Sequence, residues 1–239
     1  MSMFKVVPLP CPSCGTSVEF NAVISVNADR RPDLRAAILD ASFQREACPK
    51  CTKEFRLDPE LTYMDVGRGQ WIAAFPVAKL EAWQALEAQV EDMFNRAYGE
   101  KASRAAREIG TGLTPRLTFG WSALREKLAI VEYGLDDVIV ELTKAALFRG
   151  MARPPVALHT EMRFLGIQSG AEGETLAIAW LNSADEGVRE IFQASRALYD
   201  GIIADLGAWD LLHTELLEGP FVDMNRLLVA GAAASPSGV

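Results

Sequence analysis

The fold of this 239-residue chain is decided by a short pattern that occurs twice, as Cys11-Pro12-Ser13-Cys14 and as Cys48-Pro49-Lys50-Cys51. The two copies contain all four cysteines of the sequence. Two residues between paired cysteines allow a tight turn that points both sulfur atoms at one ion, and proline after the first cysteine fixes φ near the value this turn needs. Four thiolates form a closed shell without an open position for water or substrate. The pattern therefore predicts a structural metal site, one zinc ion per chain with the ligands Cys11, Cys14, Cys48 and Cys51.

Two other interpretations of the cysteines stay open at this point. Iron accepts the same four thiolates, although nothing else in the sequence suggests electron transfer. A thioredoxin-like redox pair would need one such motif at a helix N-terminus in a βαβ unit, which two similar pairs flanked by strands do not resemble. The 33 residues between Cys14 and Cys48 exceed the usual spacing of about 15–20, so they must form an insertion between the two turns.

Composition places the chain among ordinary soluble globular proteins, with 49% hydrophobic and 23% charged residues. The net charge is −8, and residues 151–239 carry most of it, with five Lys/Arg against twelve Asp/Glu. An acidic chain repels phosphate backbones, which disfavours nucleic acid as a partner. No stretch approaches the roughly 18 apolar residues of a membrane-spanning helix, and the first residues lack the apolar core of a secretory signal. We therefore expect a cytoplasmic protein without a membrane partner, in which thiols stay reduced.

Residues 1–76 have the pattern of short strands and turns. Residues 17–26 are rich in β-branched side chains, and residues 61–66 and 70–75 flank Gly67-Arg68-Gly69 as the two arms of a hairpin. Between them, residues 32–39 begin with proline and predict a short helix. We expect a zinc-ribbon-like antiparallel β module over this range.

The remainder of the chain is predicted to be mostly helical. Residues 77–150 have a helical apolar period and are expected to pack on the β module, with a helix-breaking linker at 110–115. Residues 151–229 predict a β-hairpin followed by a helix whose apolar stripe runs from Val188 to Ile202. The last segment, 230–239, is rich in Ala, Gly, Ser and Pro, which is typical of a disordered tail. The expected fold class is α+β.

The sequence resembles the CpXC domain family, which is named for two such cysteine motifs. The resemblance rests on residues 11–16, 32–43, 47–56, 61–65 and 124–137. It implies a largely bacterial and archaeal family that binds zinc through these cysteines and has no assigned biochemical activity. One residue departs from the family pattern: Thr52 follows the second motif where the family usually has glycine. Because threonine tolerates positive φ poorly, we expect the second turn to differ from the first.

No catalytic residue and no organic-cofactor site is predicted. His159 and His213 lie in different segments, and neither has the oriented partner that a general base requires. The Asp136-Asp137 pair is better explained as support for the first turn of a helix. We therefore expect a non-enzymatic zinc-binding scaffold that recruits a protein partner or self-associates, with no known small-molecule substrate. The alternatives are a nucleic-acid-associated regulator that uses the zinc ribbon, and an enzyme with an unrecognised site between the two halves.

Overall fold

The computed structural model describes residues 2–154, 159–171 and 173–229, and it contains two compact units. Unit 1 is built from Met1–Leu80 and Ala88–Trp121, and unit 2 from Glu81–Glu87 and Ser122–Val239, as far as these are described. Unit 1 contains the five-stranded and the two-stranded sheet, and unit 2 contains the three-stranded sheet. The predicted disordered tail, 230–239, lies outside the described residues.

Unit 1 contains a five-stranded sheet with the strand order β1-β2-β5-β6-β7. Its strands are β1 (Met3–Pro10), β2 (Ser17–Asn27), β5 (Leu61–Asp65), β6 (Gln70–Phe75) and β7 (Thr114–Phe119). The predicted hairpin around Gly67-Arg68-Gly69 is confirmed, since β5 and β6 are antiparallel on either side of that turn. The fifth strand, β7, comes from residues beyond 76, so the sheet is larger than the β module expected from the sequence.

The prediction of an antiparallel sheet was wrong, because the sheet is mixed. Strand β2 is parallel to β5, and β6 is parallel to β7. Parallel neighbours need a crossover of a dozen or more residues, usually containing a helix. Two such crossovers exist here: one contains α1 (Pro32–Leu39), and the other contains α2 (Trp83–Tyr98) and α3 (Arg104–Gly110). The first half of the predicted helical segment is thus inserted between two strands of the sheet, and only its second half, with α4 (Gly120–Glu132) and α5 (Asp137–Gly150), follows the sheet.

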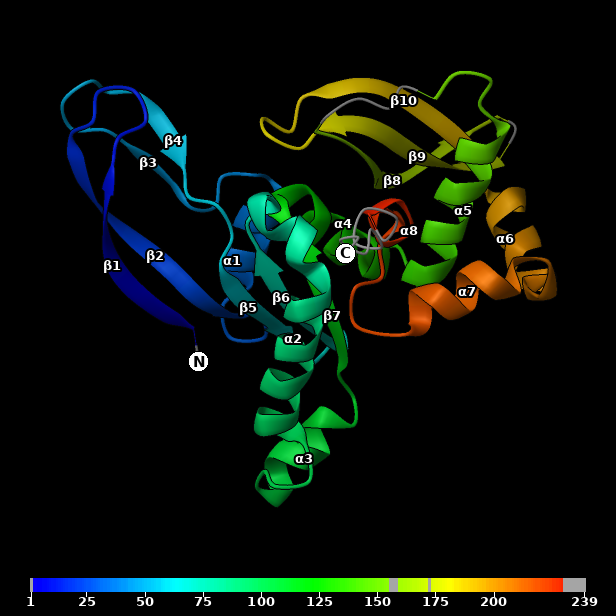
Figure 1. The fold of residues 1–239 in the computed structure, drawn as a ribbon, viewed down its shortest axis with the longest axis horizontal. Helices are drawn as coiled ribbons and strands as arrows, with labels where there is room; N and C mark the ends of the chain where they lie inside the picture. Colours follow the sequence, from blue (N-terminus) through cyan, green and yellow to red (C-terminus); the bar gives the residue numbers. More distant parts are fainter. Residues whose placement is uncertain (1, 155–158, 172, 230–239) are drawn as a thin grey trace, which may run out of the picture. The chain divides into compact units, whose positions relative to one another are not determined.

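Two short strands extend unit 1 beside the β1–β2 pair. Strands β3 (Arg45–Ala47) and β4 (Glu54–Arg56) are antiparallel to each other and lie against the β1–β2 ribbon in Figure 1. The ring centroids of Phe20 in β2 and Phe55 in β4 are 5.9 Å apart, so the β3–β4 pair packs on the β1–β2 ribbon through this aromatic contact. The predicted helix at 32–39 is confirmed as α1 and connects β2 to this short pair.

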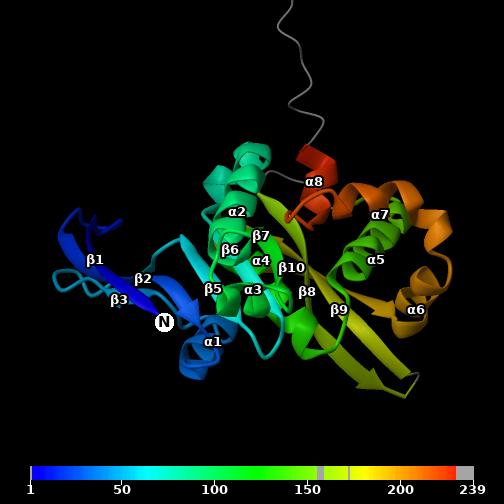
Figure 2. The same cartoon turned by 90° about the horizontal axis from the view of Figure 1, so that it is seen from below.

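Unit 2 is an α+β layer structure. Its antiparallel sheet has the order β10-β9-β8, and helices α5, α6 and α7 lie on one face of it (Figures 1 and 2). The strands are β8 (Thr160–Gly170), β9 (Gly173–Asn182) and β10 (Val188–Ser195). The helices are α4 (Gly120–Glu132), α5 (Asp137–Gly150), α6 (Arg196–Ala204), α7 (Asp210–Leu217) and α8 (Met224–Val229). The β8–β9 pair confirms the predicted β-hairpin.

The helix predicted from Val188 to Ile202 was wrong over its first half. Residues up to Ser195 form strand β10, where Phe192 pairs with Ile178 of β9. β-Branched and aromatic side chains suit such a strand as well as they suit a helical stripe. The helix begins only after Ser195, whose hydroxyl accepts the N–H of Leu198 as an N-cap.

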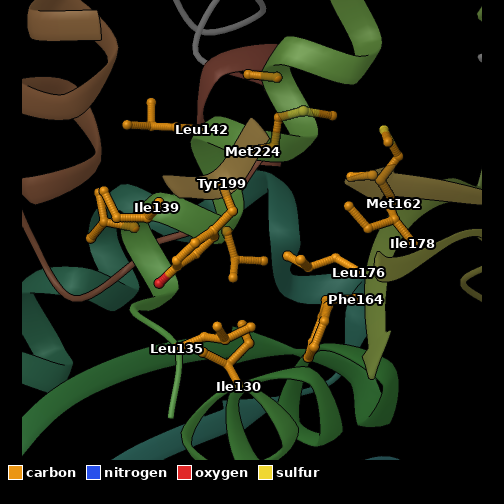
Figure 3. Close-up of a cluster of buried hydrophobic side chains, with 14 of the residues drawn as sticks. Ile130, Leu135, Ile139, Leu142, Met162, Phe164, Leu176, Ile178, Tyr199 and Met224 are labelled. Carbon is orange, nitrogen blue, oxygen red and sulfur yellow. The ribbon is translucent and has the colours of Figure 1, made fainter. Parts of the chain in front are cut away.

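The apolar core of unit 2 lies between this sheet and the helices (Figure 3). Tyr199 of α6 reaches across it, and its hydroxyl accepts the backbone N–H of Asp136 at 2.8 Å. Asp136 itself caps α5, because its Oδ1 accepts the N–H groups of Val138 and Ile139. The helix-supporting role predicted for this aspartate is confirmed.

No helix in the described part of the chain is long and apolar enough to cross a membrane.

Candidate metal centre

Each cysteine pair lies in a turn that joins two antiparallel strands. The first turn, residues 11–16, connects β1 to β2, and the second, residues 48–53, connects β3 to β4. We call these turns the knuckles, and together with β3 and β4 they form the knuckle tip of unit 1. The insertion between the knuckles is therefore β2, α1 and β3, which explains the long spacing in the sequence.

The two knuckles have the same backbone hydrogen bonds. The N–H of Gly15 donates to the carbonyl of Cys11 at 2.9 Å, and the N–H of Thr52 donates to the carbonyl of Cys48 at 2.9 Å. In both knuckles the first cysteine also donates its N–H to the carbonyl five residues later, at 2.8 and 3.0 Å. The site is thus built from two matching halves.

The expectation that Thr52 would make the second knuckle turn differently was wrong. Thr52 has φ of 60°, close to the 70° of Gly15. An L-residue in this region costs about 1–2 kcal/mol relative to glycine. The hydrogen bonds of the turn and the position of the second sulfur require the conformation, so Thr52 adopts it despite the strain.

Replacing Thr52 by glycine is therefore expected to stabilise unit 1 by about 1 kcal/mol, because it removes this backbone strain. Urea unfolding of the metal-loaded chain measures the change. Gly15→Ala is the matched control and should destabilise by a similar amount, since a Cβ at Gly15 meets no atom within 4 Å and only the φ of 70° opposes it. Equal stabilities of Thr52→Gly and the parent chain would contradict the strain argument.

The four sulfur atoms converge between the knuckles. Cys11 Sγ is 3.7 Å from Cys51 Sγ, and Cys14 Sγ is 3.6 Å from Cys48 Sγ. All four lie within 4.8 Å of one another, and none forms a disulfide. Four sulfurs at about 2.3 Å from one tetrahedral zinc ion would be separated by about 3.8 Å. The donor set and its spacing therefore fit a single four-coordinate metal ion.

The thiols are electrostatically unequal. Two hydrogen bonds with Thr16 lower the pKa of Cys14 to about 6. The larger effect comes from the Thr16 hydroxyl and the smaller one from the Thr16 backbone. The N–H of Cys51 lowers the pKa of Cys48. For Cys51 the N–H of Lys53 also acts to lower the pKa, but burial and the neighbouring thiols outweigh it and raise the pKa to about 11. Backbone donors of the knuckles thus favour thiolates, which are the form that binds metal.

Little apolar packing supports the knuckle tip. Cys11, Cys48 and Val18 form a small buried cluster, against which Cys51 and Phe55 pack in part. A hollow of about 390 Å³ opens beside it, lined by Cys11, Pro12, Ser13, Lys53, Glu54 and Phe55. So small a core stabilises a fold weakly, which is the situation in which proteins use a metal ion.

Sequence reasoning found the four cysteines but missed the side chains that support them. Thr16 lies two residues after Cys14, and its hydroxyl is 3.3 Å from that sulfur. A hydroxyl residue two positions after a cysteine is a sequence signal that could have predicted this hydrogen bond. Within the described residues, no other group of three or more Cys, His, Asp or Glu side chains has its ligand atoms as close together as these four.

A family model described as CpXC protein matches residues 9–144, which is more than half of the chain. The chain belongs to the CpXC family. The match includes both knuckles of this CpXC protein and continues through α4 into α5, so it extends beyond unit 1. No curated protein and no solved structure matches the chain.

Proposed function

We propose that this CpXC protein is a non-catalytic zinc-binding protein in which a single structural zinc ion, held by Cys11, Cys14, Cys48 and Cys51, stabilises the knuckle tip, and in which the β1–β2 ribbon that carries the first knuckle is a protein-interaction surface. The observation that carries the proposal is the convergence of four thiols with the spacing of a tetrahedral site. A complete sulfur shell has no position left for a substrate or a reactive water, which favours a structural over a catalytic metal.

Exposed apolar side chains on the β1–β2 ribbon support the interaction role. Phe4 and Val6 are 47% and 59% exposed, and they share one face of β1 because they are two residues apart. The opposite face of the ribbon is covered by the β3–β4 pair through the Phe20–Phe55 contact. Exposed apolar surface of this kind is typical of sites that bind other proteins.

Elemental analysis of the purified full-length chain tests the metal. We expect one zinc per chain, and iron only as a minor component because the same four thiolates accept it. A metal-free protein whose β3 and β4 amides are nevertheless protected from hydrogen exchange would overturn the proposed structural role.

The interaction role is tested with the double variant Phe4→Ser/Val6→Ser. We expect it to keep its zinc and its fold but to lose self-association in sedimentation velocity, or the partner that copurifies with the parent chain. Val66→Ser is the matched control, since Val66 is 40% exposed but lies outside β1. Unchanged association of the double variant would exclude the β1 surface as the binding site.

A further inference from the structure

Unit 2 contains a cluster of charged side chains that are almost completely buried. Each is at most 5% exposed, and they come from α4, α5, β8 and the residue before α8. The members of this ionic cluster are Glu126, Lys127, Glu141, Lys144, Glu161, Arg163 and Asp223. Four carboxylates thus face three cations, and Asp137 at the margin adds a fifth carboxylate by pairing with Lys127 at 3.0 Å. Fully ionised, the cluster would bury uncompensated negative charge, which is strongly unfavourable.

Most of these carboxylates have strong partners. Arg163 lies between three of them, at 3.0 Å from Glu126, 2.7 Å from Glu161 and 2.6 Å from Asp223. Both oxygens of Glu126 accept hydrogen bonds. Oε2 accepts from Arg163, and Oε1 accepts from the N–H of Phe164 at 2.6 Å and from the ammonium group of Lys144 at 2.9 Å. Close cations and backbone donors favour the ionised form of a carboxyl group.

Glu141 differs from the other members because its two oxygens have different surroundings. Oε2 accepts the N–H of Met224 and lies 2.7 Å from the ammonium of Lys144. Oε1 accepts no hydrogen bond from the described residues, and the nearest ammonium in its ion pairs is that of Lys127 at 3.7 Å. A proton on Oε1 would therefore break no hydrogen bond and would remove one of the surplus negative charges.

We propose that the ionic cluster makes unit 2 pH-responsive, with a proton held on Oε1 of Glu141 in mildly acidic medium and lost as the medium becomes alkaline. The charged groups of the cluster around this carboxyl come from α4, α5, β8 and the segment before α8. Glu126 and Lys127 of α4, Lys144 of α5, Arg163 of β8 and Asp223 interact with it directly. Asp137 and Glu161 belong to the same cluster through their ion pairs with Lys127 and Arg163.

Electrostatics agrees with this geometry. Burial raises the pKa of Glu141 from 4.5 to about 7; Lys144 opposes the rise, and the charges of Glu126 and Asp223 add to it. The folded unit then keeps a proton between pH 4.5 and about 7 that the unfolded chain has already released. The stabilisation is complete below the lower value and is lost as pH rises through the upper one.

The variant Glu141→Gln tests the proposal, because glutamine imitates the protonated carboxyl. Unfolding of unit 2 in the full-length chain is followed by urea titration with hydrogen exchange of peptides from β8 and β9, between pH 5 and pH 8. We expect the unfolding constant of the parent chain, divided by that of the variant, to rise by up to about tenfold per pH unit and to level off above pH 7. Glu126→Gln is the matched buried control and should be less stable than the parent chain at every pH, since both of its oxygens accept hydrogen bonds.

Two results would overturn the proposal. One is a parent-to-variant ratio that does not change with pH. The other is a Glu141→Gln chain in which unit 2 is less stable than the parent at pH 8 or does not fold, because a protonated glutamate must tolerate its neutral analogue. Infrared spectroscopy gives an independent measurement: at pH 6 the stretch of a protonated buried carboxyl should be present in the parent chain and absent from Glu141→Gln.

Discussion

Cys48→Ser is expected to abolish zinc binding and to unfold the knuckle tip while unit 2 keeps its structure. Structural zinc contributes on the order of 10 kcal/mol or more to the folding of small sites, and a closed shell that loses one thiolate loses most of this free energy. The packing that remains, centred on Val18 and Phe55, is too small to replace it. Hydrogen exchange should therefore show β3 and β4 losing their protection, with β8 and β9 as the internal reference.

Ser13→Ala is the matched control for this variant. Ser13 lies in the first knuckle between two ligands, is exposed, and offers no ligand atom to the cluster. Its replacement should leave one zinc per chain and full protection of β3 and β4. Treating the parent chain with a strong chelator should reproduce the effect of Cys48→Ser. Protected β3 and β4 amides in the metal-free Cys48→Ser chain would mean that the four cysteines are not needed to hold the tip together.

The convergence of the four cysteines could be predicted because its information is local. Two residues between the cysteines, and a proline after the first, describe a turn without reference to the rest of the chain. The same holds for α1, which begins at Pro32, and for the hairpin around Gly67-Arg68-Gly69. Thr52 shows the limit of this reasoning, since the hydrogen bonds of the knuckle prevailed over the conformational preference of the residue.

Strands β1 and β7 were missed because their signals are weak and their partners are distant. Pro8 and Pro10 argue against a strand in the sequence pattern of β1. Proline is nevertheless tolerated on an edge strand, and β1 is at the edge of the sheet. Pro115 has the same effect in β7, which also lies at an edge. The parallel pairing of β7 with β6 joins segments about 40 residues apart in the sequence, and no local pattern contains it.

No pattern in the sequence predicts the ionic cluster. Its members are spread from Glu126 to Asp223, and each of them, taken alone, is an ordinary charged residue of an amphipathic helix or a hairpin. Only the fold places Lys144 and Glu126 against the outer edge of β8, where Lys144 donates to the carbonyl of Met162 and Glu126 accepts the N–H of Phe164. These two side chains bind the groups that a further strand would otherwise bind, and so protect the edge.

Arg163→Met is expected to destabilise unit 2 by about 3–5 kcal/mol, because it leaves three buried carboxylates without their shared cation. This corresponds to a fall of about 10 °C or more in the melting temperature of the unit. Methionine has a similar length and keeps the apolar packing of the side chain, so the loss reports the charge. Thermal unfolding followed by near-ultraviolet circular dichroism at pH 7.5 measures it.

The surplus of negative charge makes the effect of Arg163→Met depend on pH. Burial acts to raise the pKa of Asp223, and the charge of Arg163 is the largest of those that lower it. Without the guanidinium that carboxyl binds a proton more readily, so the destabilisation should become smaller at pH 5 than at pH 7.5. Arg196→Met is the matched control, because Arg196 pairs with Asp200 at the surface and its loss should change stability by no more than about 0.5 kcal/mol at either pH. If Arg163→Met were as mild as this control, the buried ion pairs would contribute little to unit 2, and packing alone would hold α4, α5 and β8 together.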